Sequence, residues 1–161
     1  MTNDIRKKRI SIAIIAAVVL IAIVLVLGFA ARHNGANPAG SSATAVPLAP
    51  KAAYAASGEV ISGFPSGMIL DPAAKVASSY SLSYNASLSQ YTASFDSKES
   101  MADLYAAYGS YFQTSGWTVT NRITTYSTSR GIYATQGSNE ASVAIITEPN
   151  GSQVIVSYVV K

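Results

Sequence analysis

The segment DSKESMADLYAAYGSYFQTSGW, residues Asp96 to Trp117, carries a helical pattern. Large apolar side chains recur in it three, four, seven and eleven residues after the first, which places them on one face of a helix. They are Met101, Leu104, Tyr105, Tyr108 and Phe112. Asp96 suits the N-cap, with Glu99 at the capping-box spacing, and Gly116 suits the C-terminal stop. The segment therefore predicts one amphipathic helix.

Two strands are predicted before this helix. From Val76 to Tyr84, apolar and small polar residues alternate, so Val76, Tyr80, Leu82 and Tyr84 share one face with Ser78. A turn signal follows, and residues 88–95 resume the alternation with Tyr91, Ala93 and Phe95 on one face. The pair reads as an antiparallel hairpin.

Four strands are predicted after the helix. The first is marked by Trp117, Val119 and Ile123, and the others span residues 131–136, 141–148 and 153–160. Asn150-Gly151 is a strong hairpin signal between the last two. The fold class is therefore α+β, in the order ββαββββ, with a single helix packed on an antiparallel sheet. Tyrosines expected to face its core are Tyr80, Tyr84, Tyr105, Tyr108 and Tyr158.

The N-terminal part carries a different signal. Residues 10–31 hold 22 residues without a charge, most of them Ile, Val, Leu or Ala. As a helix they reach roughly 33 Å, against a hydrocarbon core of about 30 Å. In lipid the backbone must pair internally, so the many β-branched residues do not prevent a helix. We therefore predict a transmembrane helix over residues 10–31.

The flanks of this span predict its orientation. Residues 1–9 carry four basic residues against Asp4, whereas Arg32 alone follows the span directly. The positive-inside rule then makes residues 1–9 a cytoplasmic tail of a single-pass plasma-membrane protein, with the C-terminal domain outside. A cleaved signal peptide is the rival interpretation, with a small-x-small site at Gly28-Phe29-Ala30. A type IV pilin leader fits less well, because the apolar run holds no Glu.

Residues 32–62 are rich in Ala, Pro, Gly and Ser and show no persistent period, so they read as a flexible linker. As a coil, such a linker spans roughly 30 Å. Within it, Ala49 to Ser57 is expected to form a short helical turn. The extracytoplasmic α+β domain is then predicted to occupy residues 63–161.

Composition excludes several classes of function. The net charge of +3 belongs to the tail, since residues 63–161 carry five basic and six acidic residues, a net charge of −1. A basic footprint for nucleic acid is therefore missing from the domain, and no nucleic-acid partner is predicted. The chain has no cysteine, which excludes disulfides, thiolate metal sites and a lipidated Cys.

No catalytic, cofactor or metal residue is predicted. The single histidine, His33, lies in the linker, so a Ser-His-Asp triad cannot form in the domain. A hydrolase of the Ser-Lys type, using Lys75 or Lys98, is a remote alternative. The acidic residues Asp96, Glu99 and Asp103 suit the first turn of a helix, where its dipole favours negative charge.

Ten tyrosines are the unusual feature of the composition. Tyr111, Tyr126 and Tyr133 are expected to be exposed, and we predict that they form an interaction surface. A tyrosine ring offers contact area at low entropic cost and carries a polar tip.

Four short segments carry a resemblance. They are Ala73-Ala74-Lys75-Val76, Tyr91 to Phe95, Tyr105-x-x-Tyr108 and Gly116-Trp117. Over residues 64–161 the chain resembles a loosely defined group of small extracytoplasmic bacterial domains, tethered by one helix or a lipid. The resemblance implies a strand, a Tyr-bearing helix ending in Gly-Trp, and a strand meander, without an activity.

The leading functional hypothesis is a non-enzymatic, membrane-anchored binding or interaction module of the cell envelope. Its partners would be the lipid bilayer, through residues 10–31, and an envelope protein or ligand that the sequence does not identify. The alternative is a structural subunit of an envelope or secretion assembly, held through the span or a sheet edge.

Overall fold

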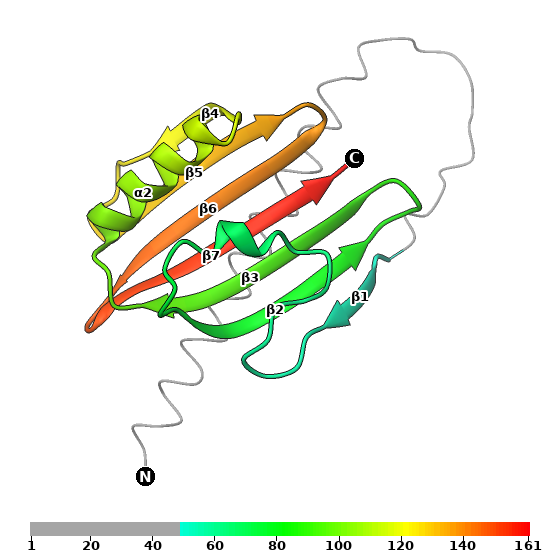
Figure 1. Ribbon diagram of the computed structural model, residues 1–161, viewed down its shortest axis with the longest axis horizontal. Helices are drawn as coiled ribbons and strands as arrows, with labels where there is room; N and C mark the ends of the chain where they lie inside the picture. Colours follow the sequence, from blue (N-terminus) through cyan, green and yellow to red (C-terminus); the bar gives the residue numbers. More distant parts are fainter. Residues whose placement is uncertain (1–48) are drawn as a thin grey trace. The chain divides into compact units, whose positions relative to one another are not determined.

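The computed structural model describes residues 49–161, in which one α-helix packs on a seven-stranded antiparallel sheet (Figure 1). The elements are β1 (Lys51–Tyr54), the 3₁₀ turn η1 (Ser66–Met68), β2 (Lys75–Ser83), β3 (Ser89–Ser97), α2 (Met101–Thr114), β4 (Thr118–Ile123), β5 (Ser129–Gln136), β6 (Asn139–Glu148) and β7 (Gly151–Val160). The predicted α+β class is confirmed, as are the single helix in this region and six of the seven strands.

The strand order is β1-β2-β3-β7-β6-β5-β4. Helix α2 carries the chain from β3 to the far edge of the sheet, and the meander β4 to β7 then returns until β7 pairs with β3. The C-terminal strand is thus central. The predicted last hairpin is present, with Glu148 opposite Gly151 across a two-residue turn.

Helix α2 starts later than the capping pattern predicted. Asp96 is not the N-cap, because β3 stays paired with β7 as far as Ser97. The N-cap is Ser100, whose hydroxyl oxygen accepts from the Asp103 backbone N–H at 3.2 Å. Ser100 Oγ also donates to the Asp103 carboxylate at 2.6 Å. The helix cap therefore forms four residues further along the chain than predicted.

The helix ends as predicted, and Gly116-Trp117 explains how. Gly116 takes a φ of +76°, which glycine adopts without steric cost. The Trp117 backbone N–H donates to the Phe112 carbonyl at 2.8 Å, and the two rings lie 5.7 Å apart, edge to face. This is a Schellman ending with its hydrophobic contact.

The core lies between the sheet and two covers. One cover is α2, whose predicted stripe is confirmed: Leu104, Tyr108 and Phe112 are buried, and Met101 and Tyr105 pack against the core. The other is residues 55–74, here called the cover loop, which contributes Phe64 and Met68. Figure 1 shows η1 of this loop over the β3–β7 side of the sheet and α2 over the β5–β6 side.

Part of the predicted linker belongs to this fold. The helical turn expected from Ala49 to Ser57 is wrong: Lys51–Tyr54 forms β1, which pairs antiparallel with β2. Val60 and Ile61 pack against the core. All four residues of β1 are exposed, so the strand forms by pairing with β2, and no periodic pattern marks it.

The face assignment for β2 is also partly wrong. Val76 lies opposite Phe95 on the core side, as predicted, but a register shift follows between Val76 and Ser78. One extra residue in a strand exchanges the two faces beyond it. Ser79, opposite the buried Ala93, therefore faces the core, and Tyr80 faces away from it.

The predicted cytoplasmic tail, residues 1–9, and the predicted span, residues 10–31, lie outside the described residues. Between residues 49 and 161, no helix has both the length and the apolar character needed to cross a bilayer.

Candidate interaction surface

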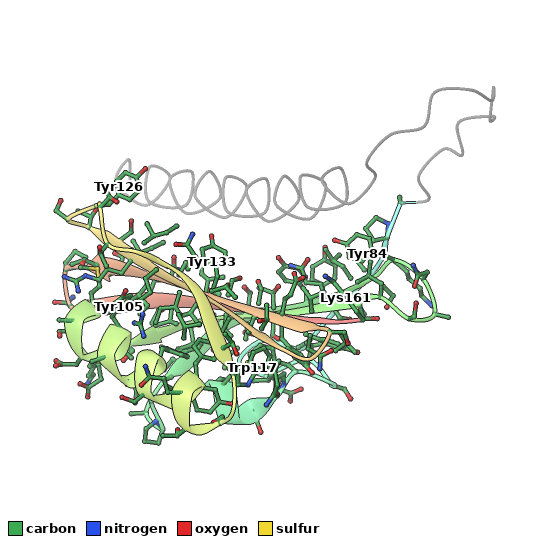
Figure 2. The ribbon with its side chains drawn as sticks, turned by 90° about the horizontal axis from the view of Figure 1, so that it is seen from above. Tyr84, Tyr105, Trp117, Tyr126, Tyr133 and Lys161 are labelled. Atoms are coloured by element: carbon green, nitrogen blue, oxygen red, sulfur yellow. The ribbon has the colours of Figure 1, made fainter. Side chains whose placement is uncertain are left out.

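The face of the sheet opposite α2 and the cover loop carries an ordered row of side chains, here called the central row. Its members stand directly opposite one another across all seven strands: Tyr54, Tyr80, Thr92, Ser157, Ser142, Tyr133 and Asn121. Figure 2 shows Tyr133 on this side of the ribbon, with Tyr105 and Trp117 on the side of α2. We call this side the helix-free face.

The middle of the row is made of short hydroxyl side chains. Thr92, Ser157 and Ser142 come from the three neighbouring strands β3, β7 and β6. Thr92 Oγ1 and Ser157 Oγ lie within hydrogen-bond distance at 3.1 Å, and Gln90 Nε2 donates to Thr92 Oγ1 at 3.3 Å. The centre of this face is therefore polar but uncharged.

Tyrosines flank these hydroxyl groups on both sides. Tyr80 and Tyr54 lie on one side with their ring centroids 6.0 Å apart, and Tyr54 is 77% exposed. Tyr133 lies on the other side. Burial raises the pKa of the Tyr133 phenol above its ordinary value of about 10.

The three tyrosines predicted from the sequence do not form one surface. Tyr133 belongs to the central row, and Tyr126 is 64% exposed in the β4–β5 loop on the same side of the sheet (Figure 2). Tyr111 lies on α2, half-buried, with its ring edge-on to Phe112 at 5.6 Å. The structure therefore brings Tyr126 and Tyr133 to one side and Tyr111 to the other.

Sequence reasoning missed Tyr54 and Tyr80 for two different reasons. Tyr54 fell within the predicted linker, and Tyr80 was assigned to the core face because the bulge after Val76 leaves no mark in the alternation. Tyr84, also expected in the core, lies on the helix-free face in Figure 2, and its hydroxyl approaches Gln90 Oε1 at 3.5 Å.

Of the acidic residues predicted at the start of the helix, Asp96 and Glu99 are exposed, and Asp103 has a structural role. Asp103 belongs to the helix cap, and the Asp71 carboxylate accepts from Ser97 Oγ at 2.6 Å. Among residues 49–161, no three His, Cys, Asp or Glu side chains gather as a metal site would require. Within the same range, neither Lys75 nor Lys98 hydrogen-bonds a serine as a Ser-Lys pair would.

Comparison of the chain with protein families, curated proteins and solved structures found no match. The class of the described region is accordingly given by its own architecture, an α+β domain with one helix on a seven-stranded antiparallel sheet.

Proposed function

We propose that the chain is a non-enzymatic, membrane-tethered binding module of the cell envelope, and that the helix-free face is its binding surface. The observation that carries this proposal is the central row, in which tyrosines flank hydroxyl side chains across the whole width of the sheet. The proposal includes the span over residues 10–31 as the tether and the outer side of the membrane as the site of binding.

The chemistry of the row favours a protein partner. Tyrosine supplies rigid amphipathic contact area, while Ser and Thr supply adaptable hydrogen bonds, and the two together are typical of protein-recognition surfaces. Tyr80 and Tyr133 are the anchors, and Ser142 and Ser157 provide hydrogen-bonding groups between them. Thr92 is only 4% exposed, and its hydroxyl lies within hydrogen-bond distance of Ser157 Oγ, so it supports the row from within. Without a charged group in its middle, the row offers hydrogen bonds and apolar contact in place of a strong field.

The edges of the sheet give less support to assembly through strand pairing. Edge strand β1 has only four residues, and edge strand β4 carries a register shift between Val119 and Asn121. Short and bulged edges are features by which proteins avoid edge-to-edge association. We therefore favour a binding module over a structural subunit that grows through its sheet edges.

Protease shaving of intact cells, followed by mass spectrometry of the released material, tests this function. We expect a compact fragment that begins between Arg32 and Lys51, because β1 is paired with β2 and belongs to the fold. A partner protein should leave the cells with the fragment in amounts that vary with conditions. The peptide of residues 1–9 should remain protected inside.

Two results contradict the proposal in different ways. Protection of residues 49–161 together with loss of the N-terminus would overturn the topology. A fixed stoichiometric complex that persists after Tyr80→Ala and Tyr133→Ala would favour the structural subunit.

A further inference from the structure

A second cluster lies on the other side of the sheet, where α2 faces β4 and β5. Tyr105 of α2 has two guanidinium groups close to its ring: the Arg122 Cζ is 5.5 Å from the ring centroid and the Arg130 Cζ is 5.3 Å from it. Both distances are typical of cation–π contacts. Figure 2 shows Tyr105 on the α2 side of the sheet, away from Tyr133.

The backbone brings both arginines to this side by specific means. The register shift in β4 between Val119 and Asn121 puts Arg122 opposite the buried Ile132, on the core side. Bulges are known to redirect side chains next to functional sites. Arg130 stands opposite the buried Ile145 on the same side.

Gly109, one helical turn after Tyr105, leaves space for Arg122. A Cβ atom at Gly109 would lie 3.1 Å from both terminal nitrogens of the Arg122 guanidinium, closer than ordinary contact. The guanidinium therefore lies close to the helix at Gly109, and a side chain there would require it to shift by a few tenths of an ångström.

The polar groups of this cluster lack partners within the described part of the chain. Neither arginine forms an ion pair with a carboxylate of residues 49–161, in contrast to Lys161 with Glu140. The Arg130 Nε and the Tyr105 hydroxyl are both buried, and neither has a hydrogen-bond partner in that range. Leaving a buried polar group without a hydrogen-bond partner destabilises the fold, and more so if the group is charged.

The two arginines are not part of a generally basic domain, because residues 63–161 carry a net charge of −1. Both guanidinium carbons lie within 5.5 Å of the centroid of one ring, so the distance between them cannot exceed the sum of the two distances to that centroid. Arg122 is exposed and Arg130 is half-buried, so water screens part of the repulsion between the two positive charges, and a bound anion would remove the rest.

We infer that Tyr105, Arg122 and Arg130 form a binding site for a phosphate group. The planar guanidinium offers donors in a fork that matches phosphate oxygens, and two such groups neutralise a doubly charged anion. The Tyr105 ring holds both guanidinium groups by cation–π contact. The phosphate belongs either to a soluble ligand or to a lipid headgroup, since both offer the same oxygens.

The test uses the full chain in non-ionic detergent, with inorganic phosphate as the probe and sodium chloride holding the ionic strength constant. Binding is followed by the rise in melting temperature, and by the NMR signal of the Arg130 Nε–H. We expect phosphate to shift both readouts. Arg122→Lys and Arg130→Lys keep the charge but lose the fork, and should weaken apparent affinity about tenfold.

Two further variants distinguish binding at this site from nonspecific attraction of phosphate to positive charge. Gly109→Ala changes no charge but displaces the Arg122 guanidinium, and should also weaken phosphate binding. Lys75→Gln removes a positive charge from an exposed position in β2, and this variant should bind phosphate as the unmodified chain does. Equal affinity in Arg130→Lys and the unmodified chain, or an unmoved Nε–H signal at all phosphate concentrations, would overturn the inference.

The source of the phosphate is decided with nanodiscs of phosphatidylcholine, with or without phosphatidylglycerol. A shift of the Arg130 Nε–H signal with phosphatidylglycerol alone identifies a lipid headgroup. A shift that requires added inorganic phosphate identifies a soluble ligand. Either shift supports the site, and the absence of both contradicts it.

Discussion

Tyr108 links the two covers of the sheet through a single hydrogen bond. Its hydroxyl donates to the Met68 carbonyl at 2.7 Å, which joins α2 to the cover loop across 40 residues of sequence. The side chain is fully buried, and burial raises the pKa of its phenol above the ordinary value of about 10. The protonated form is therefore the one that stabilises the fold.

Tyr108→Phe should cost about 1–3 kcal/mol, because the Met68 carbonyl is left buried without its donor. Since the folded-state pKa is raised, this stability is fully present below about pH 10 and is lost as pH rises through the folded value. Urea unfolding followed by Trp117 fluorescence measures it. The difference between the two proteins should narrow above about pH 10, and a constant difference from pH 8 to 11 would refute the assignment.

Gly151 illustrates a steric requirement at one residue. Its φ is +138°, and a Cβ atom there would collide with the Ser97 carbonyl oxygen and lie 2.9 Å from the Lys98 Cα. Gly137, at the β5–β6 turn, also has a positive φ of +59° but open space around it. Comparing the two positions therefore distinguishes the cost of a positive φ from the cost of a steric collision.

Gly137→Ala should cost about 1–2 kcal/mol from its backbone conformation alone. Gly151→Ala should cost at least about 1 kcal/mol more, because the end of β3 must move. Thermal unfolding of both variants checks the difference. Equal losses would show that the close approach to Ser97 is unimportant.

At the scale of elements, the helix start shows where local patterns compete. Asp96 and Glu99 fit the capping-box spacing, and so do Ser100 and Asp103 four residues later, with Asp in place of Glu. The second pair forms the cap because β3 stays paired with β7 as far as Ser97, so Asp96 is part of a strand. The local sequence does not predict this pairing. Tertiary pairing therefore decided between two plausible caps.

Ser100→Ala should destabilise the domain by about 1 kcal/mol through loss of the cap. Asp96→Ala removes the residue that the sequence pattern favoured and should change stability by less than about 0.5 kcal/mol, because Asp96 is exposed. Urea denaturation of the two variants distinguishes the two candidate N-caps. A larger loss of stability from Asp96→Ala than from Ser100→Ala would show that Asp96 caps the helix.

The apolar stripe of α2 was predicted correctly because a period of 3.6 over twelve residues has no close competitor. Leu104 is 3% exposed, so Leu104→Ala should cost about 2–5 kcal/mol. Gln113→Ala on the exposed side is the matched control and should stay within about 0.5 kcal/mol. Near-unchanged melting of Leu104→Ala would refute the stripe as part of the core.

At the scale of the whole molecule, the sequence predicted six of the seven strands but not how they lie together. Alternation shows that a strand has two faces, but a bulge of one residue exchanges them, as at Ala77 in β2 and Thr120 in β4. These bulges put Tyr80 on the helix-free face and Arg122 beneath α2. The residue pattern therefore could not predict the candidate surface or the proposed phosphate site, although Tyr133 was predicted as part of an interaction surface.

Site-specific photo-cross-linking in intact cells tests whether the helix-free face binds the partner. A photoreactive residue replaces either Tyr133, in the central row, or Tyr111, on α2, in the full chain. We expect a cross-linked envelope protein from position 133 and none from position 111. Cross-linking from position 111 alone would contradict it.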